Sequence, residues 1–482
     1  MSNEKDKKQL VVIGAGPGGY GAAFTAADLG LKVTLIDKEK NPGGVCLYRG
    51  CIPAKSLLHI TRLLVETKRC ADWGVRFPEP EIDVDKIRKW KNSVVTKLTG
   101  GLGQLCKQRK IEYVQGTARF LGDNRLEVDR KGGKTETMSF EQAIIATGST
   151  SARLPNLPED SQHIMYSDRS LELETIPGSM LVVGGGYIGL EQADTYARLG
   201  TKVTVAEMTP QLMPGTDPEL VAVLHGELKD RFHSILLQTK VTDVKHQKNG
   251  LRVVLQSEQE GQEERRFDRM LVAIGRRPHT KDLGLDQTAV ELNDRGFIQT
   301  DQRCRTADPA IFAVGDVSCE PLLAHKATYE GRVAANVAAD KDMVYEPRAV
   351  PFVEYTSPEM AACGLSEPEA QERDIPYEVA KFPWQASGRA ATLGHSTGLT
   401  KLLIDPDSRR ILGAGIVGPD AGELIPELAL AIEMAAVAMD LAWTIHPHPS
   451  LSETVMEAAA LSLNECIHYR NRRTGKDKPS KK

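Results

Sequence analysis

The sequence has no apolar run of the ~18 residues that a membrane-spanning helix needs. The closest stretch, residues 428–445, is rich in alanine but is interrupted by Glu433 and Asp440, and we expect it to form a packed interior helix. The charged N-terminal segment is followed by a short apolar run that glycines end at once, so no export signal is predicted. These absences predict a cytoplasmic protein without a membrane anchor.

Neither sign of charge dominates the sequence, and cysteine is scarce. The 61 lysines and arginines against 65 aspartates and glutamates leave a formal net charge of −4 over 482 residues. Since no basic face runs along the chain, we expect no nucleic-acid partner. The basic segment 471–482 is predicted to be a disordered tail. Eight cysteines are too few for a disulfide-built scaffold. Six scattered ones are interpreted as small buried side chains: Cys70, Cys106, Cys304, Cys319, Cys363 and Cys466.

The sequence does contain one pattern twice, over residues 10–37 and again over residues 180–207. Each copy has an apolar run, a glycine-rich turn, a helix-like segment and a second apolar run that ends in an acidic residue. The glycines of the two turns are Gly14, Gly16, Gly19, Gly184, Gly186 and Gly189. Such strand–turn–helix–strand units are typical of dinucleotide-binding folds, so two of these folds are predicted in one chain.

The glycines and the acidic residue of each unit have separate physical roles. The first glycine makes a tight turn, the second lets the backbone approach a pyrophosphate, and the third lets the helix pack closely on the strand. The helix N-terminus then presents free N–H groups to the phosphates. Asp37 and Glu207 lie where a carboxylate accepts hydrogen bonds from an adenosine ribose. Because Glu207 would repel a 2′-phosphate and no arginine follows it closely, the second unit is predicted to prefer NAD over NADP.

Cys46 and Cys51 follow the first unit directly. On an ideal helix, residues five positions apart point roughly 140° apart, so the two sulfurs can bond only across a distorted helix start, which Gly50 favours. A helix N-terminus would lower a thiol pKa, as would Arg49 or Lys55 nearby. These are the conditions for a reactive thiolate.

Three other interpretations of the cysteine pair compete with a redox role. A zinc half-site would need a second Cys or His pair with metal spacing, and none is present. A static disulfide is disfavoured in a reducing compartment. The third interpretation, two buried free thiols, is not excluded by the spacing of the cysteines. Next to a dinucleotide-binding fold, the redox interpretation is favoured.

At these residues the chain resembles the flavoprotein pyridine nucleotide-disulfide oxidoreductases, from about residue 9 to residue 470. The string at residues 446–453, which includes His448 and Glu453, is similar to that of the dihydrolipoyl dehydrogenases within this family. Supporting segments lie at residues 146–148, 275–278, 315–316, 323–327 and 355–359. The resemblance implies an α/β protein with two Rossmann-like dinucleotide-binding domains and a C-terminal α+β dimerisation domain.

The chain length of 482 residues agrees with about three domains at roughly 100–200 residues each. Their expected bounds are residues 1–150 for FAD binding, 151–278 for NAD binding, 279–350 for a return to the FAD-binding or central part, and 351–470 for dimerisation.

The resemblance implies FAD on the first unit and NAD on the second, and no metal site is expected. The residues implied to contact FAD are Gly14, Gly16, Gly19, Asp37, Lys55, Gly116, Thr147, Gly148, Gly315, Asp316 and Ala324. Those implied to contact NAD are Gly184, Gly186, Tyr187, Gly189, Glu207 and Gly275. Asp316 would bond the ribityl chain, Lys55 and Glu191 would pair near the flavin ring, and Tyr187 would cover the flavin face.

The implied activity is oxidation of protein-bound dihydrolipoamide to lipoamide with NAD. Cys46 would exchange with the substrate and Cys51 would lie next to the flavin, in a homodimer where His448 acts on the cysteines of the partner subunit. An imidazole suits a general base by its pKa near 6.5, and Glu453 would orient it. The implied partner is the lipoylated carrier domain of a 2-oxo acid dehydrogenase complex or of the glycine cleavage system.

Two alternatives remain beside this activity. One is another FAD-dependent disulfide or metal-ion reductase of the same fold, and the other is a flavin-binding sensor subunit without turnover. Tyr48 and Arg49 stand where the family usually has asparagine and valine, and one hypothesis is that Arg49 lowers a cysteine pKa.

Overall fold

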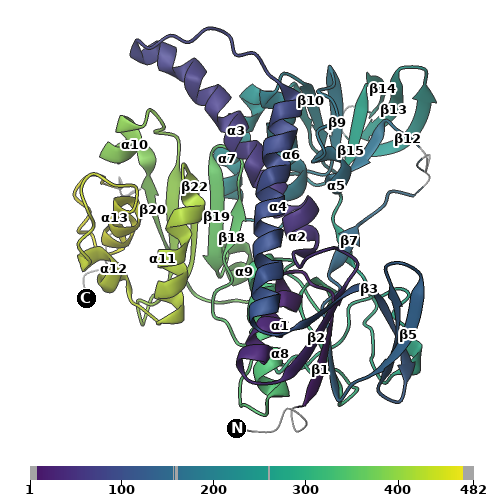
Figure 1. Ribbon diagram of the computed structural model, residues 1–482. Helices are drawn as coiled ribbons and strands as arrows, with labels where there is room; N and C mark the ends of the chain where they lie inside the picture. The colour runs from purple at the N-terminus through teal and green to yellow at the C-terminus, as the bar shows by residue number, and fades with distance from the viewer. Residues whose placement is uncertain (1–7, 156, 158–160, 259–260, 471–482) are drawn as a thin grey trace.

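The computed structural model describes residues 8–155, 157, 161–258 and 261–470, and the tail at 471–482 lies outside them. Its strands form three large sheets and two small ones. Figure 1 shows the first sheet at the bottom, the second at the upper right and the third on the left. The expected α/β fold, with two dinucleotide-binding units and a separate C-terminal sheet, is confirmed.

The first sheet has seven strands in the order β17-β6-β1-β2-β3-β4-β5. They are β1 (Gln9–Ile13), β2 (Lys32–Asp37), β3 (Glu112–Gly122), β4 (Arg125–Arg130), β5 (Lys134–Ser139), β6 (Gln142–Ile145) and β17 (Ile311–Ala313). The central strand β1 runs parallel to both neighbours, with Val11 opposite Thr34 of β2 and Ala143 of β6. Both faces of β1 are buried, which explains its continuous apolar sequence. Because β17 joins this sheet, the chain returns to it after building the second.

Helices from distant parts of the chain accompany this sheet, some packed on it and some on one another. They are α1 (Pro17–Asp28), α2 (Gly44–Arg49), α3 (Cys51–Arg69), α4 (Val84–Gln108) and α8 (Ala324–Ala338), with the 3-10 turns η2 (Cys70–Trp73), η3 (Leu285–Gln287) and η4 (Gly315–Val317). The helices α1 and α8 lie against each other so closely that a Cβ on Gly331 would stand 2.4 Å from the Gly18 carbonyl oxygen.

The second sheet repeats the same plan, with strands in the order β11-β10-β9-β15-β8. They are β8 (Ile164–Tyr166), β9 (Ser179–Val183), β10 (Lys202–Ala206), β11 (Ser234–Leu236) and β15 (Arg269–Val272). Val182 of β9 lies opposite Val205 of β10 and Leu271 of β15, all in parallel register. Its helices are α5 (Ser167–Ser170), α6 (Tyr187–Arg198) and α7 (Pro218–Arg231).

Two small antiparallel sheets complete this half of the molecule. One is made of β12 (Thr239–Gln247), β13 (Gly250–Ser257) and β14 (Gly261–Phe267). The other pairs β7 (Ser149–Ser151) with β16 (Arg276–Pro278), where the chain enters and leaves the second unit.

The third sheet is antiparallel, in the order β18-β19-β22-β21-β20. Its strands are β18 (Phe352–Glu354), β19 (Glu359–Gly364), β20 (Glu378–Pro383), β21 (Leu399–Ile404) and β22 (Ile411–Gly418). Its helices are α9 (Glu367–Glu372), α10 (Gly388–Thr392), α11 (Ala421–Glu433), α12 (Ala438–Trp443) and α13 (Glu453–Ser462), with the 3-10 turn η5 (Trp384–Ala386). Lys401 of β21 holds this sheet to α7, because its buried ammonium group lies 2.7 Å from Asp217 and 2.6 Å from Glu219.

The prediction of one packed interior helix over residues 428–445 is wrong. The helix α11 ends at Glu433 and α12 begins at Ala438, after a turn in which Ala435 has a φ of 53°. Met434 and Trp443 are 73% and 65% exposed. The segment thus has two sides, because Leu428, Ile432 and Leu441 are buried in the core while other apolar side chains are exposed on the surface of the single chain. Within the described residues, no helix combines the length and the apolar composition of a membrane span.

A buried relay of hydroxyl groups positions the start of α13. The indole Nε1 of Trp384 donates to Thr400 Oγ1 at 3.0 Å, and that hydroxyl donates to Thr454 Oγ1 at 2.9 Å. The Thr454 hydroxyl then donates to the Leu451 carbonyl at 2.8 Å. Since each hydroxyl accepts one bond and donates one, the relay is satisfied from end to end.

Replacing Thr400 with valine keeps the side-chain shape but leaves two buried polar groups without their partner. We expect Thr400→Val to lower the free energy of unfolding by about 1–3 kcal/mol in a urea titration followed by tryptophan fluorescence. The matched control is Thr392→Val on α10, where the side chain is exposed and the expected change is below about 0.5 kcal/mol. Equal effects of the two substitutions would contradict a role for the relay.

Candidate active site

The two glycine turns have the same local structure. The helices α1 and α6 begin after Gly16 and Gly186, which have extended backbone angles, and neither helix has a side-chain cap or an acidic residue in its first turn. Their first N–H groups therefore point away from the sheets without a side-chain acceptor. In both turns, the second glycine has space in front of it, since a Cβ on Gly16 would meet its nearest atom at 3.8 Å and one on Gly186 would meet nothing within 4 Å.

The other glycines of the turns are required by packing. A Cβ on Gly14 would stand 2.4 Å from the Ala146 carbonyl oxygen, and one on Gly184 would stand 2.4 Å from the Ala273 carbonyl oxygen. A Cβ on the third glycine, Gly19 or Gly189, would clash with the carbonyl oxygen of the first glycine of the same turn, at 1.8 and 2.2 Å respectively. The turns thus combine tight packing behind with open space in front, which fits a pyrophosphate at each helix N-terminus.

The two acidic residues at the strand ends also have matching bonds. Asp37 accepts the Ala15 N–H at 2.7 Å, and Glu207 accepts the Gly185 N–H at 2.7 Å. The second oxygen of each carboxylate accepts an N–H two residues further along the chain, at 2.9 and 2.8 Å. Each oxygen keeps a lone pair for a ribose hydroxyl, so both residues are suited to the sites predicted for them.

Most of the other residues predicted to contact FAD gather where β6 and β17 end, the edge at which parallel sheets bind ligands. Thr147 and Gly148 follow β6, Gly315 and Asp316 follow β17, and Ala324 begins α8. Gly116 differs, because it is buried inside β3, where a Cβ would stand 2.4 Å from the Asp129 carbonyl oxygen. Packing alone therefore accounts for a glycine at position 116.

A hydrogen-bond chain that sequence reasoning missed holds Asp316. Ser149 donates its hydroxyl proton to Asp316 at 2.5 Å, while Arg276 donates to the Ser149 hydroxyl at 2.7 Å and to its carbonyl at 2.6 Å. Ser149 lies opposite Pro278 and Arg276 lies opposite Ser151 in the β7–β16 pair, so the arginine side chain reaches along the pair to Ser149 and helps to orient a carboxylate of the first unit. Their only sequence signal was their position beside family-like segments.

The two cysteines lie on either side of a break between two helices. Cys46 is in α2, and Cys51 is the first residue of α3. Gly50 separates the helices with φ −139° and ψ −112°, which confirms the distorted helix start predicted from the spacing. Both cysteines are free thiols of intermediate burial. The break lets the two side chains meet, and it places one of them at the N-terminus of a 19-residue helix.

The cysteines share one proton unequally. The hydrogen bond from Cys46 lowers the pKa of Cys51 to about 7, and the Lys55 ammonium adds to this against the opposing effect of burial. That same bond to Cys51, followed by burial, raises the pKa of Cys46. Cys51 is thus the thiolate of the pair and Cys46 holds the proton. The hypothesis that Arg49 lowers a cysteine pKa gains no support here, because Arg49 forms an ion pair with Glu39 and is not among the main influences on either cysteine pKa.

Lys55 and Glu191 meet across the two dinucleotide-binding units. The ammonium of Lys55, on α3, lies 2.6 and 2.8 Å from the two carboxylate oxygens of Glu191, on α6. The ring of Tyr355 lies 4.5 Å from the same ammonium, and its backbone N–H bonds Glu191 at 3.4 Å. Burial raises the pKa of Tyr187 to about 12, and the nearby charges of Arg276, Asp316, Cys51 and Glu191 also act on it. The predicted Lys55–Glu191 pair and Tyr187 therefore surround the cysteine pair.

His448 and Glu453 form a second pair in the C-terminal domain. The Nδ1 atom of His448 lies 2.9 Å from Glu453, whose other oxygen accepts the Ser450 N–H at 2.7 Å. Burial opposes ionisation of Glu453, but the bonds from Ser450 and His448 outweigh it and keep the pKa of this carboxyl below its usual range. The His448 side chain is 72% exposed. Figure 1 shows α13, which Glu453 begins, on the far side of the third sheet from α2, so the single chain does not bring His448 to its own cysteines.

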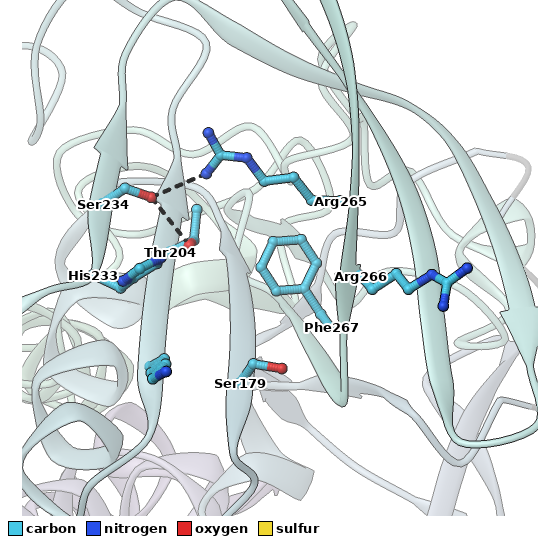
Figure 2. Close-up of a pocket in the computed structure, with 8 residues that line it drawn as sticks. Ser179, Thr204, His233, Ser234, Arg265, Arg266 and Phe267 are labelled. Carbon is cyan, nitrogen blue, oxygen red and sulfur yellow. Dashed lines mark hydrogen bonds between the residues drawn. The ribbon is translucent and has the colours of Figure 1, made fainter.

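A separate cavity lies at the opposite end of the second sheet (Figure 2). It has a volume of about 450 Å³ and is lined by Ser179, Lys202, Thr204, His233, Ser234, Arg265, Arg266 and Phe267. Ser179, Lys202 and Ser234 are the first residues of their strands, whereas the glycine turn follows the carboxyl end of β9. The cavity is therefore not part of the nucleotide site.

The comparisons with known proteins agree with this arrangement. Residues 8–331 match the family model described as pyridine nucleotide-disulphide oxidoreductase, and residues 350–459 match its dimerisation domain. A dihydrolipoyl dehydrogenase of Vibrio cholerae is 46% identical over 94% of this chain and 95% of its own length. Dihydrolipoyl dehydrogenases of Vibrio parahaemolyticus and Thermus scotoductus are 44% and 45% identical, over 98% and 96% of this chain and 99% of their own lengths.

Solved structures show the same fold. LpdA from Mycobacterium tuberculosis superimposes with a TM-score of 0.87 at 25% identity, over 94% of this chain and 99% of that one. The HOCl-induced flavoprotein disulfide reductase RclA from Escherichia coli gives a TM-score of 0.83 at 27% identity, with the same coverage. With both family domains matched and near-full-length relatives above 40% identity, the chain belongs to the dihydrolipoyl dehydrogenases of the pyridine nucleotide-disulphide oxidoreductase family.

Proposed function

We propose that the chain oxidises protein-bound dihydrolipoamide to lipoamide with NAD, through a redox-active Cys46–Cys51 pair and bound FAD. The observation that carries this proposal is the cysteine pair at the α2–α3 break, with Cys51 as a thiolate beside Lys55. FAD and NAD are the cofactors of this family. The first glycine turn and Asp37 would hold FAD, and the second turn and Glu207 would hold NAD. Bound FAD supplies the two-electron carrier between the dithiol and NAD.

The exchange of thiols can be written with its atoms and electrons balanced. In the oxidised form of the protein, Cys46 and Cys51 form a disulfide. A substrate thiolate attacks the Cys46 sulfur of this disulfide, and Cys51 leaves as a thiolate. The second substrate thiol then displaces Cys46 and closes the lipoyl disulfide. The substrate has lost two electrons, which reduce the cysteine disulfide, and two protons. Cys46 takes one of these protons and a general base takes the other. The low pKa of Cys51 favours its role as leaving group.

The general base is proposed to be His448 of the partner subunit. Its pairing with Glu453 fixes one ring nitrogen, so that the other is free to take a proton. The high exposure of His448 and the apolar side chains exposed on α11 and α12 support a dimer in which this region faces a second copy. The match to a dimerisation domain supports the same homodimer.

Two further parts of the proposal concern organisation and partner. The division into residues 1–150, 151–278, 279–350 and 351–470 is supported by β17, which returns the chain to the first sheet, and by β18, which begins the third. The proposed partner is a lipoylated carrier domain, because the relatives are named for the dihydrolipoyl group. A panel of dihydrolipoamide, glutathione disulfide and metal-ion substrates tests the activity. The proposal would be contradicted if the protein turned over one of the other substrates and did not turn over dihydrolipoamide.

Loss of the base should slow the reaction without removing the cofactor. We expect His448→Gln to reduce dihydrolipoamide turnover by at least about 10²-fold, with FAD still bound in the absorbance spectrum. The control is His225→Gln on α7, a histidine outside the site, which should leave turnover near normal. Near-normal turnover in His448→Gln would remove the proposed role.

The cation beside Cys51 should control its titration. We expect Lys55→Gln to raise the pKa of Cys51, because the ammonium favours the thiolate form. The measurement is the pH dependence of the thiolate–flavin absorbance in the dithiol-reduced protein, which should move to higher pH. Arg49→Val is the matched control, since Arg49 pairs with Glu39, and its titration should not move.

Glu207 should make the protein selective between the two nicotinamide cofactors. A 2′-phosphate would approach a buried carboxylate that already holds two N–H groups, and such like-charge contacts cost several kcal/mol. We therefore expect kcat/KM with NAD to exceed that with NADP by at least about 10²-fold, which corresponds to roughly 2.7 kcal/mol. Equal values of kcat/KM would show that the adenosine ribose of the nicotinamide cofactor does not bind at Glu207.

A further inference from the structure

Glu354 is a buried carboxyl group behind the redox centre that no step of the proposed mechanism uses. It is the last residue of β18 and is 0% exposed. Among the described residues, no side chain forms a hydrogen bond with either of its carboxyl oxygens, and only the backbone N–H of Thr356 acts on them as a weak donor. A glutamate at such a position is unusual, since buried polar groups are nearly always hydrogen-bonded.

The charged groups around Glu354 are already paired with other residues. The Lys55 ammonium bonds both oxygens of Glu191, and Asp194 of α6 bonds Arg198 at 2.8 Å and Arg231 at 2.7 Å. The charges that act on Glu354 are those of Glu191 and Asp194 on α6 and of Lys55 on α3. The elements packed against β18 carry further acidic groups, Glu359 on β19 and Glu423, Glu427 and Glu433 on α11, and Tyr355 follows Glu354 directly. No cation forms an ion pair with Glu354 in the described part of the chain.

Glu354 is therefore a neutral carboxylic acid at neutral pH. An ionised carboxylate without a partner in a buried site costs several kcal/mol, and two further carboxylates stand close by. Burial raises the pKa of Glu354 well above its usual range, and the charge of Glu191 raises it further against the opposing effect of Lys55.

The position of Glu354 couples this titration to Cys51 through one side chain. Lys55 links the two groups, because its positive charge lowers the pKa of Cys51 and also the pKa of Glu354. While Glu354 is neutral, Lys55 and Glu191 form a balanced pair and the ammonium favours the Cys51 thiolate. Once Glu354 is ionised, its negative charge offsets the positive potential that Lys55 exerts on the sulfur.

We propose that Glu354 is a positioning residue of the redox centre, which stays neutral to preserve the action of Lys55 on Cys51 and sets the alkaline limit of that action when it ionises. This inference rests on the proposed function, in which the Cys51 thiolate works beside a flavin. Glu354 touches no substrate, cofactor or reacting sulfur, and it acts only through Lys55 and Glu191.

The test is an alkaline titration of the dithiol-reduced holoenzyme, followed by its thiolate–flavin absorbance. We expect a one-proton step on the alkaline side of neutrality in the wild type, because burial and the charge of Glu191 raise the pKa of Glu354. Glu354→Gln, which imitates the neutral acid, should lose this step while its absorbance and turnover at pH 7 stay within about twofold of the wild type. Glu359→Gln is the control, since Glu359 is a second carboxyl group of raised pKa, about 7, on the neighbouring strand, and it should keep the step.

Glu354→Leu keeps the test decisive if the glutamine variant folds poorly. A buried ionisable group replaced by an apolar one of similar size is often neutral or stabilising, so this variant should also lose the step without a lower thermal midpoint. A step that persists in both variants, or that is missing from the wild type, would overturn the proposed role of Glu354 and leave the proposed function of the protein untouched. A reduced wild type without any thiolate–flavin absorbance would instead overturn the proposed redox centre, and the inference with it.

Discussion

The bond between Lys55 and Glu191 is the contact on which the rest of the site depends. It joins α3 of the first unit to α6 of the second, across 136 positions of sequence, and Tyr355 of the C-terminal domain closes it from a third side. The ammonium also acts on Cys51, so a single cation links the packing of three parts of the chain to the charge state of the reactive thiol. A buried pair of this kind contributes less to stability than to geometry, because desolvation offsets most of its attraction.

The two dinucleotide-binding units show how one local solution serves two cofactors. In both, a carboxylate at the end of the second strand holds an amide of the glycine turn at 2.7 Å, and the helix that follows has no cap of its own. The turn is thus held by contacts within the chain, and its N–H groups are suited to a pyrophosphate. Preorganised amides of this kind need little rearrangement on binding, which favours affinity for the cofactor.

The chemistry of the cysteine pair is completed by groups far from it in the chain. The break at Gly50 sets Cys51 on a helix N-terminus, and Lys55 lies one turn further along the same helix. The proposed base, His448, however, lies beyond the third sheet, on an exposed loop held by Glu453 and by the hydroxyl relay at the start of α13. A dimer in which each subunit supplies the other's base requires a rigid C-terminal domain, and the buried relay is suited to provide that rigidity.

The sequence by itself determined the two glycine turns, their acidic partners, the distorted helix start at the cysteines and the His448–Glu453 pair, because each depends on residues that are close together in the chain. It did not reveal that Arg49 turns to Glu39, that Ser149 and Arg276 hold Asp316, or that residues 428–445 form two helices with an exposed apolar side. Those outcomes depend on which distant segments meet. Glu354 illustrates the difference best, since one acidic residue in a short strand acquires a meaning only when the tertiary fold buries it completely and gives it no cation as a partner among the described residues.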